Sequence, residues 1–242
     1  MKKLIVNADD LGLNSKVNQG IIQAFKDGVV TTTSLMVTKE GFEDAVHLIK
    51  DNPRLSIGVH IDLDEYFEID HSRGRIVGYK VSPLPIDEIC SKIKQQIESV
   101  LSKDMHPSHI SSHHHVHLVK EIFPKVVELM KEYKIYGIRF SRKIMFDPNL
   151  YDEFKKIIEE NDIVSPPYFI EGWYWGNIDE PYTIAELMTH PGYGELWREY
   201  ELSASCDPKL KAYLREKNIQ LITYTDLINE VKSSKNTSGT NV

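Results

Sequence analysis

The stretch KLIVNADDLGLNSKVNQGIIQAF, residues 3–25, contains one copy of the unit from which the chain is built. Its first six residues form an apolar, partly β-branched run that is typical of a buried strand. A polar turn with two adjacent acids follows, and Asn14 or Ser15 can cap the next segment. That segment has apolar residues at helical spacing, so the stretch predicts a strand, a turn and a helix.

The same alternation recurs along the chain. Further strand-like runs lie at residues 31–38, 55–61, 108–116, 136–140, 163–170, 183–190 and 219–225. Stretches with helical spacing separate most of them, which predicts a parallel sheet. Eight strands in about 240 residues fit an α/β fold with a single-domain β/α barrel, similar to a TIM barrel, better than an open sheet.

Domain organisation follows from the same pattern. We expect one barrel domain over residues 1–230 and a polar tail over residues 231–242. The connection over residues 64–85 is polar and broken, which predicts a long loop at a functional rim. The run at 163–170 contains Pro166 and Pro167, so it is the least regular of the predicted strands.

Composition and charge exclude several classes of protein. The net charge is −7 and no basic stripe is present, which argues against a nucleic-acid-binding surface. The two cysteines, Cys90 and Cys206, fit neither a zinc-finger spacing nor a disulfide framework, so we expect a reducing, cytoplasmic location. The apolar run at the N-terminus is too short for a signal peptide or a membrane span, and no membrane partner is expected.

Residues 106–118 hold six of the ten histidines. A metal site, a histidine-rich tract for metal storage, and a solvated surface cluster all fit such a run. On a strand, alternate side chains share one face; here they would be His109, Ser111, His113, His115 and His117. We interpret His113 as a metal ligand and His115 as a ligand or a residue that orients one. His109 and His117 are interpreted as packing residues or as supports for a ligand.

Chemically versatile side chains lie at the ends of five predicted strands. They are Asp9, Asp10, His60, His113, Arg139 and His190. In a β/α barrel these strand ends meet at one mouth, where such enzymes keep their chemistry. Two imidazoles and one carboxylate leave open positions on a divalent ion, and of two paired acids one can bind the ion while its neighbour accepts a proton. Asp62 is a weaker candidate at the same mouth.

Six motifs carry a resemblance to a known family. They are IVNADDLG, SLM, GVHIDL, SHHHVH, MTHPGY and IQLITYTDL, which start at residues 5, 34, 58, 112, 188 and 219. Their order and spacing over residues 1–228 resemble the YdjC-like carbohydrate deacetylases, relatives of the chitooligosaccharide deacetylases. The resemblance implies a homodimeric hydrolase that uses a divalent metal ion to remove acetyl groups from N-acetylated sugars.

The resemblance also implies roles by position. Asp10, His60 and His113 match the metal ligands of the family, and Asp9 matches its catalytic base. Magnesium, zinc and manganese all suit such ligands. One departure stands out, because the family usually has an aspartate where this chain has Ser111. A serine brings no charge, so metal or sugar binding can differ here.

Other residues complete the predicted mechanism. His190 is the candidate donor of a proton to the leaving amine, with a turn histidine as the alternative. Arg139 can hold Asp9 ionised, and Arg142 competes for that role. Aromatic residues can stack on a sugar ring, although core packing or a dimer contact explains them equally well. These are Trp173, Tyr174, Trp175, Tyr66 and Phe67.

Two other classes of protein share some of these features. A phosphoesterase could use the same ligands but needs additional Lys or Arg residues for the phosphate. A metal-storage or sensor protein could use the histidine tract, but it needs no acids that converge from distant strands.

Overall fold

The structure is a computed structural model that describes residues 1–172 and 178–238. Within these residues a sheet of eight parallel strands forms the centre of the molecule. Its strands are β1 (Lys2–Leu11), β2 (Thr32–Leu35), β3 (Ser56–Ile61), β6 (His109–Ser112), β7 (Gly137–Ile138), β8 (Tyr168–Glu171), β9 (Ile184–Thr189) and β10 (Ile219–Leu221). All eight lie within or across the predicted runs.

The sheet is curled and forms a half-barrel. Its order is β7-β6-β3-β2-β1-β9-β8, and Gly137 of the edge strand β7 forms a parallel bridge with Val164, which precedes β8 in the chain. The predicted α/β fold with a single-domain β/α-barrel-like architecture is therefore confirmed. Strand β10 departs from the simple barrel, because it pairs with Lys2–Leu4 of β1, whereas β2 pairs with the later part of β1.

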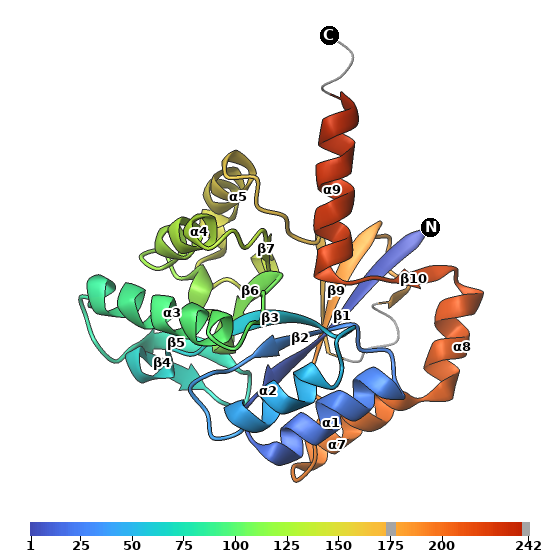
Figure 1. Ribbon diagram of the computed structural model, residues 1–242. Coiled ribbons are helices and arrows are strands. Elements are labelled where there is room, and N and C mark those ends of the chain that lie inside the picture. The colour runs from blue at the N-terminus through green and yellow to red at the C-terminus, as the bar shows by residue number, and fades with distance from the viewer. Residues whose placement is uncertain (173–177, 239–242) are drawn as a thin grey trace.

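Helices surround the sheet, as Figure 1 shows, and α9 projects away from the body. They are α1 (Ser15–Lys26), α2 (Phe42–Lys50), α3 (Ile86–Leu101), α4 (Phe123–Glu132), α5 (Tyr151–Glu160), α7 (Leu196–Cys206), α8 (Pro208–Glu216) and α9 (Tyr224–Ser238). The side chain of Asn14 caps α1 by accepting a hydrogen bond from the backbone N–H of Val17 at 3.0 Å. The segment from residue 231, which the sequence predicts to be a polar tail, is helical as far as Ser238.

The connection over residues 64–85 is structured, and its prediction as a loop is wrong. A 3₁₀ turn (Asp64–Tyr66) leads into an antiparallel hairpin of β4 (Phe67–Asp70) and β5 (Arg75–Tyr79). Phe67 and Ile76 are buried. A hairpin with one buried face needs few apolar residues, so the polar majority of this segment concealed it.

The histidine run also differs from its prediction. The strand β6 ends at Ser112, and residues His113–Leu118 form a 3₁₀ segment. His114 and His115 have φ values of 51° and 60°, in the left-handed region that an extended strand cannot contain. The expected alternation of side chains therefore stops at Ser112.

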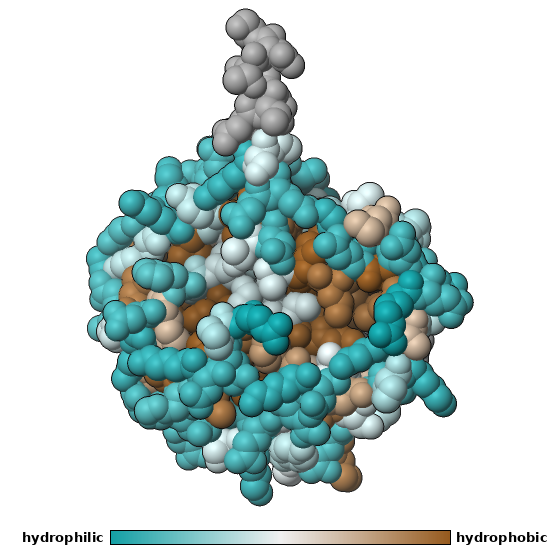
Figure 2. All heavy atoms as spheres, turned by 45° about the vertical axis from the view of Figure 1, so that its right-hand side comes forward, coloured by the Kyte–Doolittle hydropathy of each residue, from teal (hydrophilic) through white to brown (hydrophobic). Residues whose placement is uncertain are grey.

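Many of the side chains on the surface are hydrophilic, as the high content of charged residues leads one to expect. On the face in Figure 2, hydrophilic side chains form the margin and apolar ones gather toward the middle. Among the described residues, no helix is both long and apolar enough to cross a membrane.

Candidate active site

The paired acids at the end of β1 face different partners because the backbone changes conformation between them. Asp10 has φ 71°, and the register between β1 and β2 shifts between Ala8 and Leu11. Such a bulge redirects one side chain relative to its neighbour. Gly12 completes the turn with φ 95°, and a Cβ there would lie 2.3 Å from the carbonyl oxygen of Met36. Both carboxylates are buried.

Asp9 belongs to a buried network in which both of its carboxylate oxygens accept hydrogen bonds. Arg139, which follows β7, donates to both carboxylate oxygens of Asp9 at 2.5 and 2.7 Å. The same guanidinium donates through Nε to Glu186 of β9 at 2.8 Å, and Asn7 donates to Asp9 at 2.7 Å. Burial alone would raise the pKa of Asp9, but the charge of Arg139 outweighs it and the pKa lies well below its usual range. Asp9 is therefore ionised at neutral pH.

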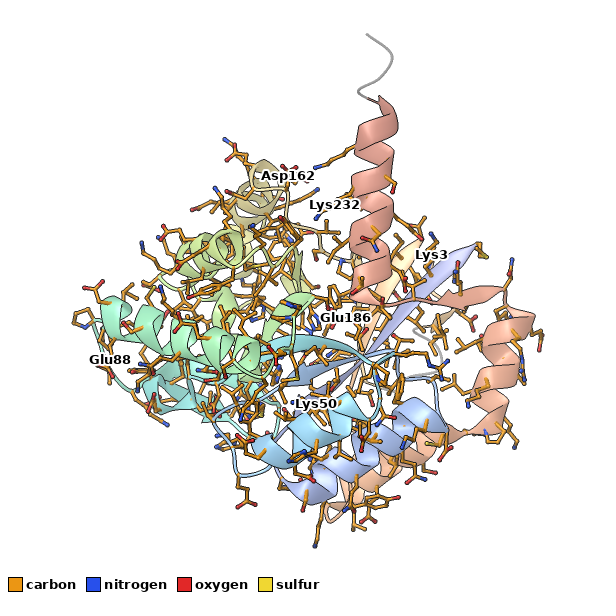
Figure 3. The ribbon with its side chains drawn as sticks, viewed as in Figure 1. Lys3, Lys50, Glu88, Asp162, Glu186 and Lys232 are labelled. Atoms are coloured by element: carbon orange, nitrogen blue, oxygen red, sulfur yellow. The ribbon has the colours of Figure 1, made fainter. Side chains whose placement is uncertain are left out.

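The network continues toward the opposite end of the barrel. Glu186 lies in the middle of the molecule (Figure 3) and accepts a hydrogen bond from the Tyr224 hydroxyl at 2.6 Å. The Tyr224 ring stacks on His109 with 4.0 Å between centroids. Gly58 makes room for this stack, because a Cβ there would lie 2.3 Å from the His109 ring. Tyr224 thus links the first turn of α9 to the interior of the site.

Asp10 has one paired and one unpaired oxygen. Arg198 of α7 donates to Oδ2 at 2.7 Å. Oδ1 is buried and has no hydrogen-bond partner among the described residues, although His60 Nε2 and His113 Nδ1 each lie 3.3 Å away. A buried carboxylate oxygen without a donor is costly unless a cation satisfies it.

Ser111 fixes which nitrogen of His60 carries the proton. The Ser111 hydroxyl donates to Ser34 Oγ at 2.8 Å, so its oxygen accepts from His60 Nδ1, also at 2.8 Å. His60 Nε2 therefore presents a lone pair toward Asp10 Oδ1. Two acceptor atoms at 3.3 Å repel each other in the absence of a cation between them.

The geometry of these ligand atoms fits a divalent ion. Asp10, His60 and His113 each offer one ligand atom, and all three atoms lie within 4.8 Å of one another. Ligands at about 2.1 Å from an ion are separated by about 3.0 Å in octahedral and about 3.4 Å in tetrahedral sites. Burial would lower the pKa of His113, but Asp10 outweighs it and raises the pKa to about 9. A position that favours a proton so strongly also favours a metal cation.

His190 follows β9 and lies between two carboxylates. Its Nε2 is 3.9 Å from Asp9 Oδ2, and its Nδ1 is 3.6 Å from Glu201 Oε2. Glu201 also accepts from the His190 backbone N–H at 2.5 Å. Burial would lower the pKa of His190, but the hydrogen bond and charge of Glu201 raise it above its usual value.

Some predicted residues lie elsewhere. Tyr66 is buried and donates to Glu88 of α3 at 2.7 Å, so it offers no free ring for a sugar. Arg142 is exposed and pairs with Asp152. Asp62 pairs with Lys39 at 2.6 Å. Trp173, Tyr174 and Trp175 lie outside the described residues.

His115 and His117 are buried beside the site. The His117 ring donates to the backbone carbonyl of Arg139 at 2.7 Å and so supports the loop that carries this arginine. His115 packs edge-on against Phe169, and its Nδ1 has no hydrogen-bond partner in the described chain. A cavity of about 220 Å³ beside His115 is also lined by Arg75, Ile76, His114, Ile144, Met145 and Phe146.

Sequence reasoning missed three charged residues of the site. Glu186 gave a signal, since it interrupts the apolar run of residues 184–188. Arg198 and Glu201 gave none, because α7 reads as an ordinary surface helix. Only the packing of α7 against α1 brings them to the strand ends.

Comparison with known proteins places this architecture in a family. The family model described as YdjC-like protein matches residues 3–216. The chain belongs to the YdjC-like family. Among its relatives, a carbohydrate deacetylase of Clostridium beijerinckii is 32% identical, with 93% of this chain and 100% of the relative covered. A chitooligosaccharide deacetylase of Proteus mirabilis is 31% identical, with 93% and 98% covered.

A solved structure supports the same placement. The crystal structure of a protein from Enterococcus faecalis V583, named for cellobiose-phosphate cleavage, superposes with a TM-score of 0.71 and 25% identity. It covers 93% of this chain, and this chain covers 98% of it. This YdjC-like protein thus shares its whole barrel with that structure, not one motif.

Proposed function

We propose that the protein is a carbohydrate deacetylase that hydrolyses the acetamide of N-acetylated sugars with one divalent metal ion. The observation that carries the proposal is the buried, unpaired Oδ1 of Asp10 between two imidazole nitrogens at 3.3 Å. The names of the curated relatives supply the class of substrate. Asp10, His60 and His113 would hold the ion, and magnesium, zinc and manganese are the candidates.

Two residues next to the metal ligands would carry out the proton transfers, one as the base and the other as the acid. A divalent ion supplies a Lewis acid that lowers the pKa of water and polarises a carbonyl oxygen. Asp9 is ionised and accepts the proton of the attacking water. Its depressed pKa means that it holds this proton only briefly. Arg139 and Asn7 keep its carboxylate in one orientation.

His190 acts as the proton donor to the leaving amine. The hydrogen bond and charge of Glu201 raise the pKa of His190, which favours the protonated ring, and Glu201 also fixes the ring orientation. Because its Nε2 lies 3.9 Å from Asp9 Oδ2, the acid and the base are neighbours in the site. Environments that shift the pKa values of two neighbouring groups in opposite directions assign one of them as the base and the other as the acid.

The substrate would lie against exposed aromatic side chains. Trp197 is 47% exposed and packs edge-on against His190 with 5.6 Å between centroids. Phe146 is 41% exposed and lines the cavity beside His115. These rings take the place of Tyr66 as candidate platforms for a pyranose. A homodimer and a cytoplasmic location stay predictions.

A phosphoesterase fits this site less well. Recognition of a phosphate needs cationic groups that are free to bind it. Arg139 is occupied by Asp9 and Glu186, and Arg198 by Asp10 and Glu195. Both arginines are thus held by carboxylates, and Nη1 of Arg198 is their one donor atom without a partner among the described residues.

The proposal is tested by measuring acetate released from N,N′-diacetylchitobiose. Metal-free protein should release none, and zinc, magnesium or manganese should restore release. Asp9→Asn should lower the rate by about 10²–10⁴-fold, the contribution of a general base. Asp87→Asn, at an exposed position of α3, is the matched control and should keep the wild-type rate. Release that needs no metal, or an undiminished rate in Asp9→Asn, would overturn the proposal.

A further inference from the structure

A second group of metal-ligating side chains lies on the rim of the site. Asp64, His113 and His114 each offer a ligand atom, and these atoms lie within 4.8 Å of one another. His114 Nδ1 is 2.9 Å from Asp64 Oδ1, and His113 Nε2 is 3.7 Å from Asp64 Oδ2. We propose that these three residues form a second cation site, which prefers zinc to magnesium, next to the ligand group of Asp10.

The distances suit a small ion with nitrogen and oxygen ligands. In a tetrahedral zinc site, ligand atoms at about 2.0–2.2 Å from the ion lie about 3.3–3.6 Å apart. The two separations in the structure end on different oxygens of Asp64: Oδ1 lies 2.9 Å from His114 Nδ1, a hydrogen bond in the absence of an ion, and Oδ2 lies 3.7 Å from His113 Nε2. Small rotations of the half-exposed Asp64 carboxylate, whose side chain is 28% exposed, can equalise them. Solvent would supply the remaining ligand.

The irregular backbone after β6 creates this group. If the strand continued past Ser112, His113 and His114 would point to opposite faces of the sheet. Instead the chain turns into a 3₁₀ segment with His114 at φ 51° and ψ 20°. The two rings then lie 3.9 Å apart, and both face Asp64 of the turn before the hairpin. Two non-adjacent segments thus meet at the rim.

His113 connects the two sites through its two ring nitrogens. Its Nδ1 faces Asp10 and its Nε2 faces Asp64. If both sites were filled, His113 would be shared between the two ions through its two ring nitrogens, and both ring protons would pass to solvent. This arrangement favours zinc or copper(II), which bind imidazole well, over magnesium, which prefers oxygen ligands and retains its water. The two sites therefore share the ligand His113, and the second site depends neither on Asp10 nor on the reaction.

The experiment counts bound zinc on chelator-stripped protein after titration with zinc chloride and desalting. Wild type should bind two ions per chain, whereas Asp64→Asn and His114→Gln should each bind one. Asp70→Asn and His106→Gln are matched controls from the hairpin and from the exposed start of the histidine run, and both should bind two. Magnesium in place of zinc should give no more than one ion in every variant.

The outcomes separate this inference from the proposed function. Saturation of the wild type at one zinc would overturn the second site and leave the deacetylase proposal standing. The same holds if Asp64→Asn weakens binding of a single ion without changing the number bound, since Asp64 would then only orient His113. Asp10→Asn tests the first site alone, and it should retain the ion on Asp64 and His114.

Discussion

The site has a floor and a rim that are built in opposite ways. The floor consists of Asp9, Arg139, Glu186 and Tyr224. The rim consists of Asp64, His113 and His114. Every member of the floor is buried, and hydrogen bonds of 2.5 to 2.8 Å join each to the next. The rim is partly exposed, and its ligand atoms lie 2.9 to 3.7 Å apart.

Because of this difference, the floor keeps its side chains in a fixed geometry, whereas the rim can exchange a bound ion. The floor holds charges that cannot reach solvent, so it keeps Asp9 ionised and immobile. The rim exposes nitrogen and oxygen atoms that can gain or lose an ion without unfolding the barrel. Asp10 stands between them, with Oδ2 fixed by Arg198 and Oδ1 free.

The largest expected effect comes from breaking the floor. Arg139→Met leaves two buried carboxylates, Asp9 and Glu186, without their cation. Removing one partner of a buried ion pair typically costs about 3–5 kcal/mol. We expect the free energy of unfolding, measured with urea, to fall by that amount.

Arg142→Met is the matched control for this change. Arg142 is exposed and pairs with Asp152 at 3.2 Å, an interaction that contributes about 0–1 kcal/mol. Equal losses in the two variants would show that the buried network does not stabilise the fold.

A smaller effect is expected when Ser111 is replaced, because this serine orients the predicted metal ligand His60. Ser111→Ala removes the acceptor for His60 Nδ1. Loss of such an orienting partner typically weakens metal binding by about 10–100-fold. Isothermal titration with manganese measures the affinity, and Ser91→Ala on the exposed face of α3 is the control.

The variant Ser111→Asp sharpens the same comparison. It keeps an acceptor at His60 Nδ1 and introduces the aspartate that the resemblance to the family predicts at this position. Retained affinity in Ser111→Asp with a loss in Ser111→Ala would assign the effect to the hydrogen bond. No change in Ser111→Ala would remove the orienting role.

A pH-dependent effect concerns the buried histidine under the Arg139 loop, His117. Burial holds the pKa of His117 down at about 3, so the unfolded chain binds a proton below about pH 6.5 that the folded chain does not. Stability therefore falls as the pH drops from about 6.5 to 3, by up to about 1.4 kcal/mol per pH unit from this group. Urea unfolding of metal-free His117→Gln should show a shallower decline by that amount. An identical slope would contradict the assigned shift, and His106→Gln is the control.

The features that could be predicted from the sequence are those that depend on the periodicity of the strands. Apolar runs placed all eight strands, and strand ends placed Asp9, His60 and Arg139 at one mouth. Parallel strands force such ends together, so a local pattern was enough to predict a distant contact.

What the sequence could not predict depends on local backbone geometry and on helix packing. The left-handed conformations of His114 and His115 have no glycine or proline to announce them. The pairing of Arg198 with Asp10 depends on the docking of α7, across 188 residues of chain. The hairpin of residues 67–79 was hidden by its polar face.

The central claim is that the ion bound through Asp10 Oδ1 is the one that the reaction needs. The most direct measurement titrates metal-free protein with manganese and follows bound ion and acetate release from N,N′-diacetylchitobiose together. Both should rise in proportion up to one ion per chain in the wild type and in Asp44→Asn, an acid of α2 that bonds to Asn18. In folded Asp10→Asn both should be lost. Full acetate release by metal-free protein, or by Asp10→Asn, would contradict the account.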